Sequence, residues 1–128
     1  MNLLLDTHIW IWSKLEPERL GRRVRAELSK TDHQLWLSPV SVWEALLLMQ
    51  KGRVRVESPF VWVERAAELL REAPLTQEIV RIGLALPLPQ ADPADRFLAA
   101  TAKVLKLTLV TADHRLLGLG EIATLANR

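Results

Sequence analysis

Two acidic residues of the sequence follow short apolar runs, and two more have apolar neighbours. Asp6 ends the run "LLLD", and Asp113 lies two residues beyond the run "LTLVT". Glu44 and Asp95 have apolar residues three and four positions away, the spacing of one helix face. Carboxylates that converge repel one another and need protons or a cation. Because the chain has no cysteine and no histidine at metal-ligand spacing, these oxygen ligands favour Mg²⁺ or Mn²⁺, which can activate water for phosphodiester hydrolysis.

Helix capping is the alternative interpretation for the aspartates. Asp6 and Asp113 each follow a predicted strand, where Asp commonly caps the next helix. In "DPAD", Asp92 as the cap and Pro93 as the first helical residue make a good helix start that requires no function. Asp95 then turns toward the packed face, so one carboxylate of this segment can cap while the other serves a site.

Glu44 also has a capping alternative. In "SVWE" it would reach back to the amide of Ser41 as part of a capping box. Ser38 followed by Pro39 offers an earlier helix start, which leaves Glu44 inside the helix. A charge among apolar residues is costly without a partner, so a functional role for Glu44 is favoured over a cap.

Apolar runs and helical periodicity predict the elements that position these acids. Buried parallel strands are expected at 2–6, 34–38 and 107–111, and a short edge strand within the last residues, "EIATLANR". Helices are expected at about 39–50, 60–71, 76–84 and 95–106. This alternation predicts a three-layer α/β/α sandwich around a mainly parallel sheet. Ligands bind at the carboxyl edge of such sheets, where we expect the four acids to converge.

The length and composition indicate one ordinary globular domain spanning 1–128. The chain is 49% hydrophobic and 25% charged, which is unlike a disordered sequence. It has no apolar run long enough to span a membrane and no secretory signal pattern, so a cytoplasmic location is expected.

Most basic and aromatic residues are assigned structural roles. Arg22, Arg23 and Arg25 lie between Leu20, Val24 and Leu28, whose helical spacing points them inward, which predicts a solvated face for the arginines. Core or dimer packing is favoured over base stacking for Trp10, Trp12, Trp36, Trp43 and Trp62. His8 and His114 are interpreted as structural. Arg96 and Arg115 are candidates for contacting phosphate, with ion pairs to nearby carboxylates as the favoured role.

The sequence resembles the PIN domain nucleases, and among them the VapC-type toxins of toxin–antitoxin pairs. The resemblance lies in four segments in the family's order: "LLLDTHIWIW" (3–12), "LSPVSVWEALLLMQKGRV" (37–54), "DPADRFLAATA" (92–102) and "LTLVTAD" (107–113). It implies that Asp6, Glu44, Asp95 and Asp113 form an acidic quartet that holds Mg²⁺ or Mn²⁺. Thr111 matches a hydroxyl position near the metal.

The resemblance also implies a substrate and partners. The substrate would be single-stranded or loop RNA, cut by hydrolysis to leave a 3′-hydroxyl and a 5′-phosphate. The chain would form a homodimer and be neutralised by a small antitoxin, and it would reach DNA only through that antitoxin. Two positions depart from the family pattern: Gln90 and Ala91 stand where histidines are frequent, and Ala94 stands where an aromatic residue is common.

Other classes fit less well. A dehalogenase-type phosphatase would need a second aspartate at the position of His8, and a response-regulator receiver would need adjacent acids near the first strand. The remaining alternative is a non-catalytic PIN-like module that binds protein or RNA. The intact quartet opposes it, since four unused carboxylates would be an electrostatic liability.

Overall fold

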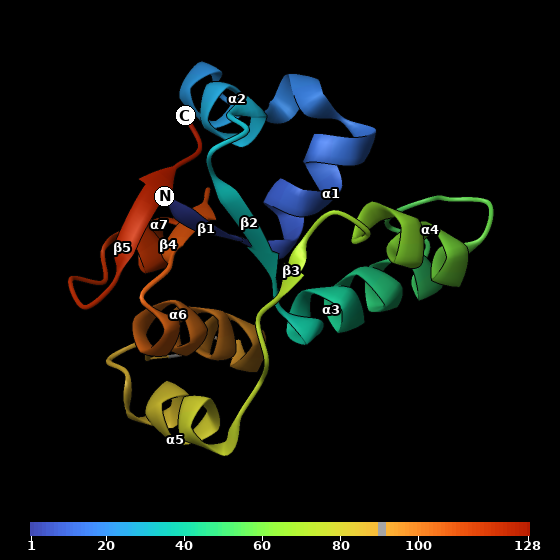
Figure 1. Ribbon diagram of the computed structural model, residues 1–128. Coiled ribbons are helices and arrows are strands. Elements are labelled where there is room, and N and C mark those ends of the chain that lie inside the picture. The colour runs from blue at the N-terminus through green and yellow to red at the C-terminus, as the bar shows by residue number, and fades with distance from the viewer. Residues whose placement is uncertain (90–91) are drawn as a thin grey trace.

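A five-stranded parallel sheet forms the centre of the protein (Figure 1). The computed structural model describes residues 1–89 and 92–128. The strands are β1 (Asn2–Leu5), β2 (Gln34–Leu37), β3 (Arg71–Glu72), β4 (Thr108–Thr111) and β5 (Ala123–Ala126). Their order is β3-β2-β1-β4-β5, so the first strand of the chain lies in the middle. Leu4 of β1 pairs with Trp36 on one side and with Leu109 on the other.

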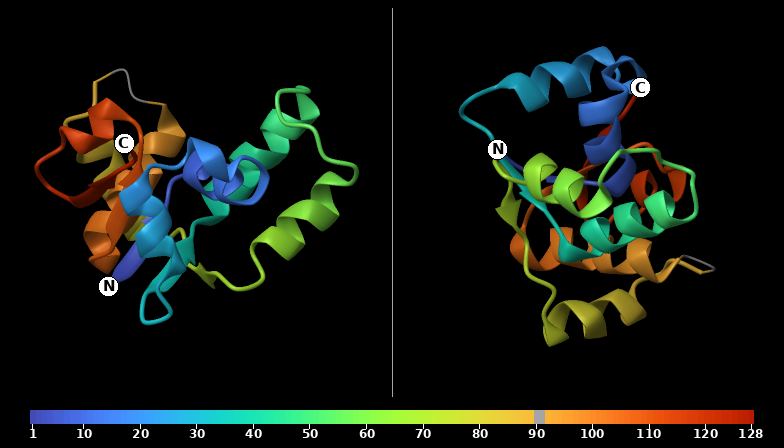
Figure 2. Two further views of the ribbon diagram at one scale, coloured as in Figure 1. Left: turned by 90° about the horizontal axis from the view of Figure 1, so that it is seen from above. Right: turned by 90° about the vertical axis from the view of Figure 1, so that its right-hand side faces the viewer.

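Helices cover both faces of this sheet. The α-helices are α1 (Thr7–Leu15), α2 (Arg22–Ser29), α3 (Pro39–Gln50), α4 (Pro59–Ala66), α5 (Gln77–Ala85), α6 (Pro93–Leu105) and α7 (His114–Leu117), and a 3-10 helix, η1, spans Pro17–Arg19. Helices α3 and α4 lie side by side and project from one side of the molecule, whereas α5 packs on α6 (Figures 1 and 2). No helix among residues 1–89 and 92–128 has the length and apolar character needed to cross a bilayer.

The alternation of side chains along β1 builds a core on each face. Leu3 and Leu5 pack with Trp10 and with apolar residues of α1 to α4. Leu4 points the opposite way and packs with residues such as Ala99 on the side of α5, α6 and α7. A strand buried on both faces accounts for the uninterrupted leucines, and the predicted three-layer α/β/α sandwich is confirmed.

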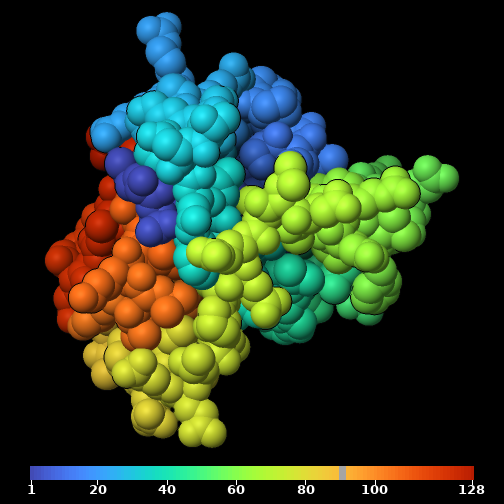
Figure 3. Space-filling view, viewed as in Figure 1, coloured from blue at the N-terminus to red at the C-terminus, as the bar shows by residue number. Residues whose placement is uncertain are grey.

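Most predicted elements are confirmed, but the predicted helix 60–71 is too long. Helix α4 ends at Ala66, whose carbonyl oxygen accepts a 3.0 Å hydrogen bond from the indole nitrogen of buried Trp10. The chain then turns, and Arg71 pairs with Trp36 to begin β3. In the space-filling view the green segments of α3 and α4 protrude from one side of the molecule (Figure 3). Residues 67–71 are good helix formers, so helix propensity alone does not predict that α4 ends at Ala66.

The predicted surface of α2 is confirmed, while the tryptophans differ among themselves. Arg22, Arg23 and Arg25 are exposed, and Val24 between them is buried. Trp10 is fully buried; Trp12, Trp36 and Trp62 are half-buried; Trp43 is 58% exposed and does not belong to the core.

Arg96 fastens helix α5 to helix α6. Its guanidinium donates hydrogen bonds to the carbonyl oxygens of Gly83, Leu84, Leu86 and Leu88, at 3.1, 3.4, 3.1 and 2.5 Å. Gly83 and Leu84 lie in the last turn of α5, where carbonyls lack partners within the helix, and Leu86 and Leu88 lie just beyond it. At Gly83 a β-carbon would lie only 3.2 Å from the Arg96 carbonyl oxygen, so the glycine permits the close approach of the two helices.

Arg96 is therefore expected to contribute to stability. Arg96→Met removes the donor from several partly buried carbonyls and should lower the free energy of unfolding by about 2 kcal/mol. Urea denaturation measures this, with Arg81→Met as the control because Arg81 is exposed on α5. Equal losses of unfolding free energy in both variants would contradict a stabilising role for the Arg96 hydrogen bonds.

Candidate active site

Asp6 and Thr111 join the ends of the two central strands. Asp6 follows β1 directly, and its backbone N–H donates to Val110 of β4 at 3.0 Å. Its carboxylate accepts hydrogen bonds from the Thr7 amide at 2.7 Å and from the Thr111 hydroxyl at 2.5 Å. The same Thr111 oxygen accepts a 3.0 Å bond from the Asp113 amide. Asp6 is thus both the cap of α1 and part of the edge where a site was predicted, so the two interpretations do not exclude each other.

Glu44 reaches the same edge from helix α3. Ser38 caps α3, with its hydroxyl 3.1 Å from the Val40 amide, so the earlier helix start is confirmed. The Glu44 carboxylate accepts a hydrogen bond from the Thr7 hydroxyl, which also lies 2.9 Å from the Ser41 hydroxyl. Burial raises the pKa of Glu44, the bond from Thr7 opposes that shift, and the charge of Asp6 adds to it.

Asp95 stands in the first turn of α6 and has the most perturbed carboxyl group. Burial, followed by the charges of Asp6 and Asp113, raises its pKa to about 7. The pKa of Asp6 is also raised, mainly by burial, although the Thr111 bond opposes the shift. Burial is thus the main cause of both shifts, and repulsion from the neighbouring carboxylates adds to it.

Asp113 differs from the other three acids in the direction of its pKa shift, because the side chain of Arg115 binds its carboxylate. It caps α7, and its carboxylate accepts bonds from the Arg115 amide at 2.8 Å and from the Arg115 guanidinium at 3.1 Å. Burial would raise the pKa of Asp113, but the bonds and charge of Arg115 outweigh it and the pKa is lowered. The guanidinium also contacts Asp95 at 3.2 Å, so the ion pairing favoured for Arg115 is confirmed.

The four predicted acids line one pocket of about 440 Å³. Its lining is Asp6, His8, Trp12, Glu44, Asp92, Asp95, Ala112, Asp113 and Arg115. Asp92 occupies the cap position of α6, but its side chain makes no capping hydrogen bond there and instead lines the pocket. The side chains of four separate elements therefore converge as expected.

Two residues of this pocket were not anticipated as part of a site. His8 was interpreted as structural, but it is exposed in the pocket wall, and its ring centroid lies 5.6 Å from that of Trp12. Its charge lowers the pKa of Asp6. The four-residue spacing of His8 and Trp12 puts both on the face of α1 that begins beside Asp6, and this spacing is visible in the sequence.

Arg96 and the two departures from the family pattern lie apart from the acids. The favoured ion pair for Arg96 is wrong, because its guanidinium binds the carbonyls that end α5. Ala94 is buried and borders a separate apolar pocket of about 340 Å³ beside exposed Trp43. Gln90 and Ala91 fall outside the described residues.

The donor chemistry of the acidic pocket fits a hard divalent cation. Ionised carboxylates offer only acceptor oxygens, which Mg²⁺ and Mn²⁺ prefer, and the pKa of Asp95 is raised by burial and by the neighbouring carboxylates, whose charge a bound cation would offset. In the described part of the chain, however, no three His, Asp or Glu side chains are already grouped as metal ligands. Asp95 and Asp113 share the Arg115 guanidinium instead.

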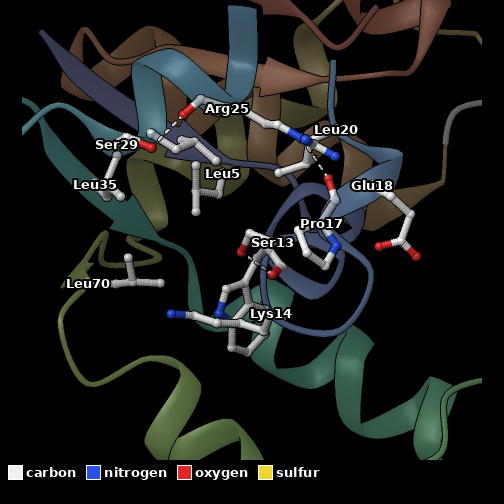
Figure 4. A pocket seen from close by; sticks show the side chains of 12 residues that line it. Leu5, Ser13, Lys14, Pro17, Glu18, Leu20, Arg25, Ser29, Leu35 and Leu70 are labelled. Atoms are coloured by element: carbon white, nitrogen blue, oxygen red, sulfur yellow. Dashed lines mark hydrogen bonds between the residues drawn. The ribbon is translucent and has the colours of Figure 1, made fainter. Parts of the chain in front are cut away.

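A larger pocket of about 540 Å³ lies away from the acids, between α1, η1, α2 and the sheet (Figure 4). Leu5, Leu20 and Leu35 form its apolar wall, while Glu18 is the one carboxylate in its lining. The Arg25 side chain is tied to the Pro17 carbonyl at 3.0 Å. Size alone therefore does not identify the site; the convergence of carboxylates does.

The raised pKa of Asp95 leads to a prediction about stability without metal. An acid with a raised folded-state pKa contributes stability below its unfolded value of 3.8 and loses it as the pH rises through about 7. Asp95→Asn should therefore raise the free energy of unfolding at about pH 8 by roughly 1 kcal/mol, with a smaller gain at about pH 5.

Urea denaturation in EDTA at both pH values measures this gain. Asp32→Asn is the matched control, because Asp32 is exposed in the turn between α2 and β2. A variant Asp95→Asn that is no more stable than the wild type at the higher pH would contradict the repulsion inferred for the pocket.

Comparison with known proteins identifies the family. The PIN domain matches residues 3–122. Ribonuclease VapC22 from Mycobacterium tuberculosis is 33% identical over 117 residues, which cover 90% of this chain and 89% of that protein. The structure of VapBC2 from Rickettsia felis, bound to a DNA fragment from its promoter, is 16% identical, covers 100% of both chains and has a TM-score of 0.78. FitAcB from Neisseria gonorrhoeae is 25% identical over 95% of both chains, with a TM-score of 0.70. Because the family match spans nearly the whole length, this chain belongs to the PIN domain family.

Proposed function

We propose that this chain is an endoribonuclease that uses Mg²⁺ or Mn²⁺ to hydrolyse phosphodiester bonds of single-stranded or loop RNA. The observation that carries the proposal is the convergence of Asp6, Glu44, Asp95 and Asp113 from four elements on one pocket. The relative that is named a ribonuclease, VapC22, supports RNA as the substrate.

Each acid has a distinct position for this chemistry. A divalent cation, when bound, supplies a Lewis acid that polarises the phosphodiester and lowers the pKa of water. Asp6, Asp95 and Asp113 would hold the cation. One oxygen of Glu44 is fixed by the Thr7 hydroxyl, so its other oxygen can orient a water or complete the metal site. Thr111 keeps Asp6 and Asp113 at a constant spacing through its hydroxyl.

The proposal includes toxin–antitoxin partners and a cytoplasmic location. Structural neighbours named as VapBC complexes support a small antitoxin as the partner, with DNA binding through that antitoxin. A homodimer is supported by exposed apolar residues on α3 and α4, among them Trp43 at 58% and Phe60 at 74% exposure. Exposed apolar surface of this kind is typical of protein interfaces.

A non-catalytic binding module remains the competing function. It needs the PIN fold but has no use for the acidic pocket. The pKa values of Asp6, Glu44 and Asp95 are raised mainly by burial and partly by neighbouring negative charges, so holding these acids ionised in the pocket costs stability. That electrostatic cost favours a catalytic role for the pocket.

Cleavage of RNA by the purified chain tests the proposal. With Mn²⁺ or Mg²⁺, a mixed structured RNA should be cut, and EDTA should stop the reaction. Asp6→Asn keeps the helix cap but removes the charge, so its cleavage rate should fall about 100-fold or more. Asp32→Asn, prepared identically, should cut like the wild type and controls for contaminating nuclease.

Calorimetry with Mn²⁺ separates the possible failures. If the wild type neither cuts several RNAs nor binds Mn²⁺, the binding module replaces the nuclease. Equal cleavage by the wild type and Asp6→Asn would remove Asp6 from the mechanism.

A further inference from the structure

Arg115 places a positive charge inside the acidic pocket. Its guanidinium lies 3.2 Å from Oδ2 of Asp95 and 3.1 Å from Oδ2 of Asp113, and so bridges α6 and α7. Of the residues that line the pocket, Arg115 and His8 are the basic ones, and only Arg115 pairs with the acids directly. The guanidinium therefore occupies the space between two of the proposed metal ligands.

Local geometry brings this cation to the site. Asp113 caps α7, and Arg115 donates its backbone N–H to Oδ1 of Asp113 at 2.8 Å. The Arg115 side chain then folds back over the same carboxylate, with Nε 3.4 Å from that oxygen. Because Arg115 follows Asp113 by two residues, the turn that begins α7 is enough to bring the Arg115 charge to the Asp113 carboxylate.

The ion pair is also exposed enough to be released. The Arg115 side chain is 55% exposed, whereas those of Asp95 and Asp113 are 17% and 24% exposed. Pairs in contact with solvent contribute little free energy, because water screens them and the long side chain gives up rotamer freedom. The guanidinium can leave, while the carboxylates cannot turn away as easily.

We propose that Arg115 is an internal counter-cation that holds the place of the divalent ion between Asp95 and Asp113 and is displaced when that ion binds. The inference rests on the proposed function, because it assumes that these two acids bind a metal. The Nη2 atom of Arg115 contacts Oδ2 of Asp95 and Oδ2 of Asp113, so a divalent ion held by both acids would compete with the guanidinium for these carboxylates. A guanidinium and a dication at the same oxygens would repel each other, so binding of one releases the other.

A positioning role for Arg115 would have the opposite effect on metal binding. If Arg115 instead positions Asp95 and Asp113 for the metal, its removal leaves the two carboxylates free to repel, and metal binding weakens. Competition and positioning therefore predict opposite changes in affinity.

Titration with Mn²⁺ decides between these roles without any RNA. The dissociation constant, measured by calorimetry and by the electron paramagnetic resonance signal of free Mn²⁺, should fall about tenfold in Arg115→Gln. Arg115→Lys keeps the charge but loses the two-pronged contact, so its dissociation constant should lie between those of Arg115→Gln and the wild type. Arg23→Gln is the charge-matched control, because Arg23 is exposed on α2 and does not line the pocket.

Melting temperature supplies the second readout. In EDTA, Arg115→Gln should melt below Arg23→Gln, because the acids have lost their bound cation, and saturating Mn²⁺ should raise its melting temperature more than that of the wild type. Unchanged or weaker Mn²⁺ binding in Arg115→Gln, with normal binding in the wild type, overturns the inference and leaves the nuclease intact. Absence of Mn²⁺ binding in every variant overturns both.

Discussion

Repulsion between half-buried carboxylates is the constraint on which the organisation of this protein depends. Four acids can share one edge of a sheet only if other groups hold them there. Two threonines hold three of them: Thr7 binds Asp6 through its amide and Glu44 through its hydroxyl, and Thr111 connects Asp6 to the Asp113 amide. The fourth, Asp95, is bound by the Arg115 guanidinium. Both threonines are buried: Thr111 lies in β4 itself, and Thr7 begins α1, which contacts β4. The sheet therefore fixes the positions of the threonines, and the threonines fix the positions of the acids that they bind.

Two adjacent residues of helix α6, Asp95 and Arg96, point to different neighbours. Asp95 faces the pocket at the edge of the sheet, while Arg96 turns to α5 and binds the carbonyls at its end. Since both belong to the first turn of the helix, anything that loosens α5 also loosens the support of Asp95. Helix α6, which carries the acid with the most strongly shifted pKa, is thus anchored to α5 by Arg96, the residue that follows that acid.

The sequence allowed much of the sheet and the acidic quartet to be predicted, because both follow from local patterns. Apolar runs marked β1, β2 and β4, and position at strand ends marked Asp6 and Asp113. Contacts between distant segments were not predictable: the indole of Trp10 ends α4 at Ala66, and β3 has no apolar pattern of its own. The ion pair predicted for Arg96 is wrong for the same reason, since adjacency to Asp95 in sequence says nothing about which carbonyls lie on the other face of the helix.

The double role of Asp6, as helix cap and as pocket acid, bears on how such a protein can evolve. Asparagine caps helices as well as aspartate does, so exchanging one carboxylate oxygen for an amide nitrogen leaves the start of α1 intact while removing the charge. A single nucleotide change in the Asp6 codon suffices for this exchange. A lineage can therefore give up the chemistry of the pocket in one step and keep the fold, which offers a short path to descendants that only bind their partners.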